Sequence, residues 1–258
     1  MDLITVRETR VATTRSDIVL GPGEAPLGGG TWLFSEEQPG LTGLVDLTGL
    51  GWPALTATAD GLSIAATCTI AELSRYDHPL FWQCANSLLA SFKIWNIATV
   101  GGNICTSLPA GAMISLAAAL DAEAVIWSPD GSEKRMPVAD FVTGPRMNAL
   151  AHGEVLRSIE IGRSALGQRT AFRRIALSPL GRSGTLIIGR REGDGLVITI
   201  TAGTPRPVQL RFTSMPSAAE LRAAVDGVEE WYDDPHGAPD WRHATSALFA
   251  EEIRQELS

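Results

Sequence analysis

The sequence KIWNIATVGGNI at residues 93–104 contains a glycine pair that decides how the chain is interpreted. Consecutive glycines allow successive backbone N–H groups to turn toward one anion, and the neighbouring Thr99 and Asn103 add side-chain donors. A similar stretch, LGGGTW, occupies residues 27–32. Two such stretches predict a site for the phosphate groups of a ligand. Neither has the GxGxxG pattern of a Rossmann site or the terminal GK[ST] of a P-loop, which indicates another fold.

The composition is that of a globular protein and excludes several classes of function. The chain has 258 residues, with 21 Lys and Arg against 29 Asp and Glu, which gives a net charge of −8. Since nucleic-acid binding depends on clustered Lys and Arg, a nucleic-acid partner is excluded. No stretch approaches the ~20 apolar residues that span a bilayer, so we expect no membrane span. The N-terminal sequence MDLITVRETR has no signal-peptide pattern, which favours a cytoplasmic location.

The cysteines and histidines form no metal-site or catalytic pattern. Cys68, Cys84 and Cys105 are widely spaced, so we expect buried thiols and no disulfide framework, zinc site or iron–sulfur cluster. The four histidines occur singly, and no serine has the GxSxG context of a nucleophile. The sequence therefore predicts no metal site and no catalytic side chain. Two basic pairs, at residues 173–174 and 190–191, favour surface or subunit contacts, or the attraction of an anionic cofactor or NAD.

Apolar runs separated by turn residues predict strands throughout the chain. Asp60-Gly61, a strong hairpin signal, lies within an alternating stretch and predicts a β-hairpin over residues 55–67. Strands are also expected at residues 43–47, 124–127, 134–138, 155–161, 170–177, 185–190, 196–201 and 208–212. The spacing of the runs after residue 154 predicts that they form an antiparallel sheet.

Capping signals place the expected helices. Thr69-x-x-Glu72 and Ser217-x-x-Glu220 are capping boxes that begin two helices, and Asp240 is expected to cap the last one. Helical periodicity also covers residues 80–92 and 112–120. The order of these elements predicts an α+β fold. We expect two α+β subdomains, residues 1–54 and 55–163, and then a sheet-plus-helices domain at residues 164–258.

Four segments together resemble a known protein family. Residues 93–104 are similar to the R-N-x-A-T-[IV]-G-G-N-[IL] segment of the FAD-binding medium subunit of molybdenum hydroxylases, the family of xanthine, carbon monoxide and aldehyde dehydrogenases. Residues 28–31 resemble the first glycine loop of that family, usually A-G-G-T or A-G-G-H. Residues 139–144 and 153–161 resemble its D-F-F-x-G and G-E-x-[IL]-x-x-I-x-[IV] segments. The four segments follow the order and spacing of the family.

The resemblance implies a two-subdomain FAD-binding fold of the PCMH type, as in relatives of vanillyl-alcohol oxidase, followed by a small C-terminal domain. It implies that FAD lies between the two N-terminal subdomains, with its diphosphate and nearby ribityl oxygens on the glycine stretches. The residues concerned are Leu27, Gly28, Gly29, Gly30, Thr31, Trp32, Thr99, Val100, Gly101, Gly102 and Asn103. Leu156 matches an apolar residue that packs on the flavin, and Arg173 falls where the family often places a Lys near the ring.

The resemblance also implies a function and partners. The chain is then the FAD-binding electron-transfer subunit of a molybdenum hydroxylase complex, an oxidoreductase in which the chemistry belongs to the cofactor. The implied partners are a molybdopterin-binding large subunit and a small subunit with two [2Fe-2S] clusters, together forming a heterotrimer. Electrons pass from the iron–sulfur subunit through the flavin to an acceptor such as NAD, quinone or dioxygen.

Two positions depart from the family pattern and keep alternatives open. Ala112 stands where the family commonly has an Asp that contacts the cofactor, and Trp32 stands where Asp, Asn or Ser is usual. A flavin-free assembly subunit that keeps the fold is therefore an alternative. A third interpretation is a stand-alone flavin oxidoreductase of related fold, although such enzymes carry a substrate domain and a catalytic base that this sequence does not reveal.

Overall fold

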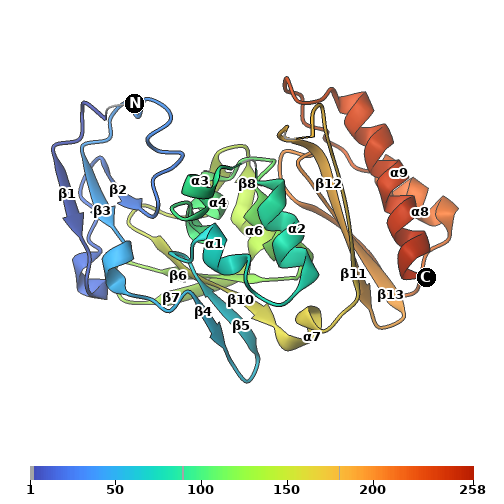
Figure 1. Ribbon diagram of the computed structural model, residues 1–258, viewed down its shortest axis with the longest axis horizontal. Helices are drawn as coiled ribbons and strands as arrows, with labels where there is room; N and C mark the ends of the chain where they lie inside the picture. The colour runs from blue at the N-terminus through green and yellow to red at the C-terminus, as the bar shows by residue number, and fades with distance from the viewer. Residues whose placement is uncertain (1–2, 89, 180) are drawn as a thin grey trace.

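The computed structural model of the chain describes residues 3–88, 90–179 and 181–258. Three units lie side by side, and Figure 1 shows them in chain order from the N-terminal strands on the left to the C-terminal helices on the right. We call residues 3–54 the N-terminal unit, residues 55–163 the middle unit and residues 164–258 the C-terminal unit. These bounds follow the expected domain boundaries, which stay a prediction, and each unit contains one main sheet.

The N-terminal unit is built on a parallel sheet with the strand order β1-β3-β2. Its elements are β1 (Glu8–Val11), the 3-10 turns η1 (Arg15–Asp17) and η2 (Thr48–Leu50), β2 (Glu24–Leu27) and β3 (Gly43–Asp46). The strand expected at residues 43–47 is thereby confirmed. Arg10 of β1 and Glu24 of β2 form an ion pair at 2.8 Å across β3. A small core of Ala12, Ile18, Val45 and Leu47 includes Val155 of the middle unit.

The middle unit contains an antiparallel sheet with the order β4-β5-β10-β6-β7. Its strands are β4 (Leu55–Ala57), β5 (Gly61–Ala65), β6 (Glu123–Trp127), β7 (Glu133–Pro137) and β10 (Val155–Gly162). The hairpin around Asp60-Gly61 and the strands expected near residues 124–127 and 134–138 are confirmed. The runs after residue 154 are antiparallel but do not form one sheet: β10 pairs with β5 and β6 in the centre of this sheet, within the expected subdomain 55–163, whereas the later strands pair with one another.

Short helices and a small hairpin complete the middle unit. They are α1 (Ile70–Leu73), α2 (Pro79–Ser87), α3 (Phe92–Trp95), α4 (Val100–Thr106), α5 (Ala112–Ala119), α6 (Val138–Phe141), β8 (Val142–Gly144) and β9 (Met147–Asn148). The short helix α7 (Arg163–Leu166) crosses the boundary to the C-terminal unit. The capping box of Thr69 and Glu72 begins α1, and α5 confirms the helix expected at residues 112–120. The helix expected over residues 80–92 is interrupted: Leu88 is extended after α2, and Ser91 begins the separate helix α3.

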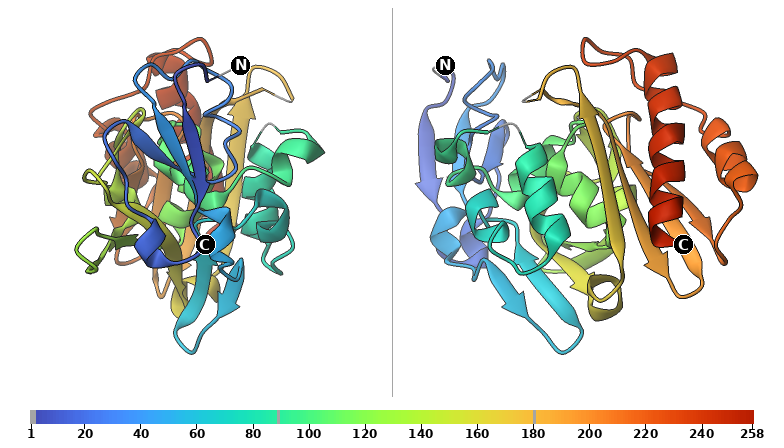
Figure 2. Two further views of the ribbon diagram at one scale, coloured as in Figure 1. Left: turned by 90° about the vertical axis from the view of Figure 1, so that its left-hand side faces the viewer. Right: turned by 45° about the vertical axis from the view of Figure 1, so that its right-hand side comes forward.

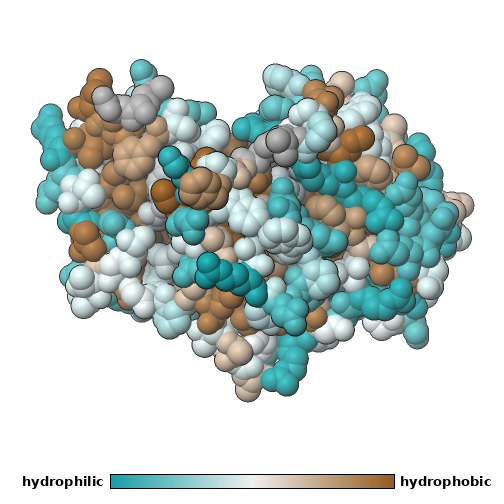
Figure 3. Space-filling model, viewed as in Figure 1, coloured by the Kyte–Doolittle hydropathy of each residue, from teal (hydrophilic) through white to brown (hydrophobic). Residues whose placement is uncertain are grey.

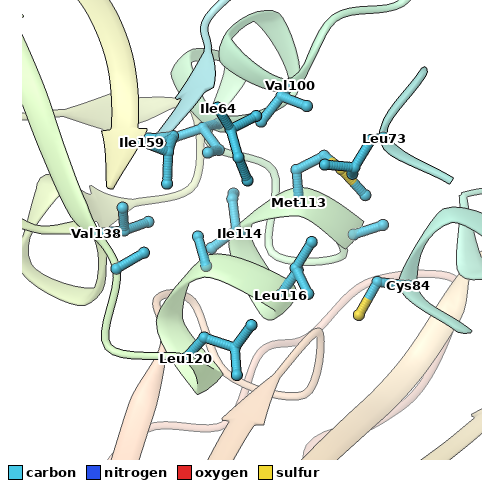
Figure 4. Packing of buried hydrophobic residues seen from close by; sticks show 14 of the residues in the cluster. Ile64, Leu73, Cys84, Val100, Met113, Ile114, Leu116, Leu120, Val138 and Ile159 are labelled. Atoms are coloured by element: carbon cyan, nitrogen blue, oxygen red, sulfur yellow. The ribbon is translucent and has the colours of Figure 1, made fainter. Parts of the chain in front are cut away.

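The middle unit encloses the main hydrophobic core, which Figure 4 shows at close range. Ile64, Val100, Ile114 and Ile159 bring side chains from β5, α4, α5 and β10 into this core. All eight residues of α5 are buried, so this helix has no face toward solvent. Cys68 and Cys84 are also buried here as free thiols, as expected, and both serve as packing groups. Burial raises the pKa of the Cys68 thiol to about 12, which keeps it protonated and unreactive.

The C-terminal unit is an antiparallel sheet, in the order β11-β12-β13-β14, with two helices. Its elements are β11 (Thr170–Ala176), β12 (Ser183–Glu192), β13 (Gly195–Thr201), β14 (Val208–Phe212), α8 (Ala218–Asp226) and α9 (Pro239–Leu257), and α9 runs along the sheet (Figure 2). The expected antiparallel sheet and the capping box of Ser217 and Glu220 are confirmed. Asp240 does not cap α9: Pro239, which is favourable at the first helical position, begins this helix, and Asp240 lies in its first turn.

The middle and C-terminal units share a buried junction. Leu186, Ile188 and Ala202 of the C-terminal unit belong to the main core. Arg190 of β12 is only 2 % exposed, donates to Ala119 O at the end of α5 at 2.9 Å and pairs with Asp121. Burial raises the pKa of Asp121, but a hydrogen bond from Arg211 and the charge of Arg190 bring it below its usual value. Arg190 therefore stabilises this junction and is not available to attract an anionic cofactor or NAD.

Candidate functional site

The first glycine stretch follows β2 and forms an open loop. Leu27 O accepts a hydrogen bond from Leu47 N at 2.9 Å where β2 ends, and Phe34 N donates to Gly30 O at 2.9 Å where the loop closes. Gly30 has a φ of +71°, a left-handed conformation that favours glycine. The backbone N–H groups of residues 28–33 donate to none of the residues that the structure describes. These consecutive donors are therefore open to an acceptor from outside the chain. We call residues 27–33 the donor loop.

The second glycine stretch is not a loop but the first turn of α4, which corrects the expectation drawn from its composition. Thr99 is the N-cap residue of this helix. The N–H groups of residues 100, 101 and 102 donate to Cys68 O at 2.8 Å, Ala66 O at 2.9 Å and Thr99 Oγ1 at 3.0 Å, respectively. The donors that a helix leaves open at its N-terminus are thus used inside the protein. A role for residues 99–103 at the cofactor stays a prediction, and the N–H groups of residues 100–102 are not open to an anion in this arrangement.

The donor loop and the start of α4 touch each other although they are far apart in the sequence. A Cβ atom on Gly29 would lie 1.7 Å from Ile97 O, and one on Gly28 would lie 2.6 Å from Thr99 Oγ1. Real Cβ atoms essentially never approach other atoms below 3.0 Å, so only glycine permits this contact. The structure therefore brings residues 27–32 and 99–103 to one place, the junction of the N-terminal and middle units.

Polar and aromatic side chains beside this junction can contact a ligand. Thr31 makes no hydrogen bond to the described residues through its hydroxyl group. Asn103 Oδ1 accepts from Met113 N at 3.0 Å, which leaves the Asn103 amide N–H groups as donors. The half-buried Trp32 ring has its centroid 6.0 Å from Arg146 Cζ. Sequence reasoning does not find Arg146, because it follows Gly144-Pro145, just beyond the segment at residues 139–144 that resembles the family.

Leu156 and Arg173 are not brought to the donor loop. Leu156 is 3 % exposed and lies within the main core of the middle unit. Arg173 lies on β11 and forms ion pairs at 2.8 Å with Glu252 and Glu256 of α9. The hydrogen bonds from Arg173 to these two carboxylates hold the side chain against α9 and raise the pKa of its guanidinium. A role for Leu156 or Arg173 at the flavin stays a prediction, and neither side chain is free to take it in this arrangement.

Ala112, the position that departs from the family pattern, is fully buried. It is the first residue of α5 and is 0 % exposed. A carboxylate here would be enclosed, with a large desolvation cost unless it were paired. The polar contact that the resemblance would place at this position is therefore absent, and nothing at Ala112 replaces it.

The surroundings of the donor loop are apolar. The ring of Phe34, which is 44 % exposed, lies directly against Gly30, and Ile97, which is 51 % exposed, contacts Gly29 through its backbone carbonyl group. Figure 3 shows brown, apolar residues over the N-terminal unit on the left and mainly teal, hydrophilic residues over the C-terminal helices on the right. The donor loop therefore combines neutral hydrogen-bond donors with an apolar rim, an arrangement that suits a ligand with both anionic and aromatic parts.

Comparison with known families decides where this geometry belongs. Residues 8–163, more than half of the chain, match the family described as the FAD binding domain in molybdopterin dehydrogenase. The chain belongs to this family. The matched region includes the donor loop and α4, so the resemblance seen in the sequence is confirmed over the N-terminal and middle units.

Two curated relatives of this FAD-binding family member match parts of the chain. The nicotinate dehydrogenase FAD-subunit of Eubacterium barkeri is 36% identical over 95 residues, which are 36% of this chain and 32% of that subunit. The xanthine dehydrogenase/oxidase of Gallus gallus is 30% identical over 139 residues, which are 47% of this chain and 10% of that protein. The matches thus span about a third and a tenth of the length of these relatives.

A solved structure extends the likeness to the whole chain. Quinoline 2-oxidoreductase from Pseudomonas putida 86 superposes with a TM-score of 0.83 at 19% identity, over 100% of this chain and 98% of that chain. At this identity the likeness shows the fold alone. It includes the C-terminal unit, which lies outside the family match, and it confirms the expected α+β fold.

Within the described ranges, no group of three or more His, Cys, Asp or Glu residues is arranged to hold a metal ion. In the same part of the chain, the structure has no helix with the length and apolar character needed to cross a membrane.

Proposed function

We propose that this chain is the FAD-binding electron-transfer subunit of a molybdenum hydroxylase complex. The observation that carries the proposal is the donor loop, whose N–H groups at residues 28–33 have no acceptor in the described protein and lie against α4. The family match over residues 8–163 and the FAD-subunit relative support FAD as the cofactor.

The donor set of the loop fits the diphosphate group of FAD. Residues 27–33 carry no charged side chain, and their open backbone N–H groups are donors that cost no side-chain ordering. The Thr31 hydroxyl and the Asn103 amide are the side-chain donors beside them. Unlike the backbone of residues 100–102, these groups are free to bind an anion.

The residues of this chain would bind, orient and shield the cofactor. Gly28, Gly29 and Gly30 would hold the diphosphate, Thr31 and Asn103 would fix its position, and Trp32 would cover it from solvent. When bound, FAD supplies two-electron redox chemistry through its flavin ring. No acid or base from this chain is assigned to that chemistry.

The partners and the setting belong to the same proposal. Electrons would arrive from a small subunit with two [2Fe-2S] clusters, after oxidation of substrate at a molybdopterin-binding large subunit, and would leave to NAD, quinone or dioxygen. Oxidoreductase activity of the heterotrimer and a cytoplasmic location stay predictions. Support comes from the relatives, which are named as dehydrogenases or oxidoreductases.

An absorbance spectrum from 300 to 600 nm tests the proposal. We expect the purified chain, alone or co-expressed with its partner subunits, to show two flavin bands and to release FAD on heating. Titration of flavin-free protein with FAD and with riboflavin should show tighter binding of FAD, because only FAD carries the diphosphate. A chain that takes up no FAD, even with its partners, would overturn the proposal.

A flavin-free assembly subunit is the second candidate, and Ala112 is the observation that favours it. The buried methyl group of Ala112 cannot supply the polar contact that the family pattern places there. Full activity of a complex without flavin would support this second function. The donor loop argues against it, since its consecutive N–H groups at residues 28–33 have no acceptor among the described residues and are placed to bind an anion.

A further inference from the structure

Arg146 occupies a constrained position at the tip of the β8–β9 hairpin. Its φ is +61°, a left-handed conformation that residues other than glycine rarely adopt. Arg146 N donates to Ser107 O at 2.8 Å, and Asn148 Nδ2 donates to Cys105 O at 2.8 Å. The hairpin is thus fastened to the end of α4, and such strained residues concentrate at functional sites.

The side chain of Arg146 crosses from the middle unit to the donor loop of the N-terminal unit. Its Nη1 lies 3.5 Å from Glu36 Oε2, and the two side chains are 57 % and 43 % exposed. Its Cζ lies 6.0 Å from the Trp32 ring centroid, at the outer limit of a cation–π contact. Both contacts are weak, because an exposed ion pair at this distance contributes little. The guanidinium therefore lies beside the donor loop, where only weak contacts with Glu36 and Trp32 hold it.

We propose that Arg146 exchanges Glu36 for the diphosphate of the ligand in the donor loop. This inference rests on the proposed function. The loop supplies only neutral donors, so a charged diphosphate bound there lacks a counter-charge from residues 27–33. A guanidinium binds phosphate oxygens through parallel charge-assisted hydrogen bonds, which are stronger than an exposed contact with a carboxylate. Arg146 is then an affinity-determining residue, and Glu36 competes with the diphosphate for its guanidinium.

Calorimetric titration with FAD and with riboflavin tests the exchange in four variants of the full chain. In Arg146→Asn the charge is removed, and Asn tolerates the left-handed conformation, so the hairpin is preserved. Arg146→Lys keeps the charge without the planar fork. Glu36→Gln removes the competing carboxylate. The double variant, which combines Arg146→Asn with Glu36→Gln, completes a double-mutant cycle. Arg135→Gln is the matched control, because Arg135 is also about half exposed, at 53 %, and pairs with a carboxylate. Its partner is Glu133, at 3.3 Å, and both residues lie on β7 and not in the donor loop.

We expect Arg146→Asn to bind FAD roughly tenfold or more weakly, as for loss of a charged hydrogen bond, with riboflavin unchanged. Arg146→Lys should recover part of the affinity. Glu36→Gln should bind FAD a few-fold more tightly, and this gain should vanish in the double variant. Arg135→Gln should match the wild type, and thermal melting should show that all variants fold.

Two results would overturn the exchange alone while the proposed function stands. One is FAD affinity in Arg146→Asn equal to that of the wild type. The other is an equal loss of FAD and riboflavin affinity, which would assign Arg146 a structural role in the junction. A wild-type chain that binds no FAD would overturn the proposed function, and the exchange with it.

Discussion

The donor loop and the first turn of α4 are both rich in glycine, yet they use their backbone donors in opposite ways. The carbonyl groups of Ala66 and Cys68, just after β5, accept the first N–H groups of α4. No described carbonyl group accepts from residues 28–33. Both stretches need glycine for close approach between segments, at Gly29 in one and at Gly101 in the other. Glycine composition therefore marks close packing, whereas the surrounding backbone decides whether donors stay open for a ligand.

The largest effect is expected from Gly29→Ala, because the added methyl group would clash at the point where the two stretches touch. The new Cβ atom would lie 1.7 Å from the Ile97 carbonyl oxygen, a backbone atom that cannot rotate away. We expect about 3 kcal/mol of lost stability, measured by denaturant unfolding, and loss of FAD binding. Gly162→Ala is the control, since a Cβ atom there meets nothing within 4 Å. An unchanged FAD affinity would mean that the junction is not the binding site.

Gly101→Ala is expected to separate packing from binding. Its Cβ atom would lie 2.5 Å from Ala66 Cβ and 2.7 Å from Ala66 O, inside the middle unit. We expect about 2 kcal/mol of lost stability from overpacking. FAD affinity of the folded variant should stay close to that of the wild type, because this turn offers no open donor. A selective loss of FAD affinity, with stability unchanged, would break the comparison between the two stretches.

The two threonines that flank these stretches give a matched pair of changes. Thr99→Ala removes the N-cap of α4 and should cost about 1 kcal/mol of stability. Thr31→Ala removes a hydroxyl group without a described partner, so stability should be unchanged. FAD should bind Thr31→Ala several-fold more weakly if the hydroxyl donates to the diphosphate. Chemical unfolding and FAD titration of both variants check the pair, and the reverse pattern would exchange the roles assigned to the two stretches.

The smallest effect is expected from the pH dependence of the sheet that carries the donor loop. Hydrogen bonds from Arg10 and from Gly21 N–H hold the pKa of Glu24 below its usual value of 4.5. A lowered pKa in the folded state means that the stabilisation is present above pH 4.5 and is lost as the pH falls through the folded pKa. The Tm difference between wild type and Glu24→Gln should therefore shrink progressively as the pH falls below 4.5. A difference that stays constant throughout an acid titration from pH 7 would show that the charge of Glu24 is not its cause.

Much of the fold could be predicted because its signals are local. The Asp60-Gly61 turn and the capping boxes beginning at Thr69 and Ser217 depend on residues only a few positions apart, and all formed as expected. The sheet to which β10 belongs depends on pairing with distant strands, which spacing along the chain does not encode. The interruption between α2 and α3 was missed because apolar periodicity continues through extended residues.

The candidate site could be predicted as far as its glycine stretches, and the rest required the three-dimensional arrangement. That Gly28 and Gly29 meet Ile97 and Thr99 is consistent with the shared site that the resemblance implies. The internal use of the first α4 donors could not be foreseen, because the accepting carbonyl groups come from a separate turn. Likewise, the ion pairs of Arg173 depend on α9, whose packing against β11 is a tertiary contact.

The complete burial of α5 has a consequence for biosynthesis. A ribosome releases the apolar segment Ala112–Ala119 well before it makes β12 and β13, which supply part of the cover of this helix. Until the chain has grown beyond Thr201, part of the apolar surface of this helix therefore stays uncovered in the nascent protein, which favours aggregation. Chaperone binding during translation should accordingly be centred on this segment, and chains that terminate before the C-terminal sheet should be recovered mainly in inclusion bodies.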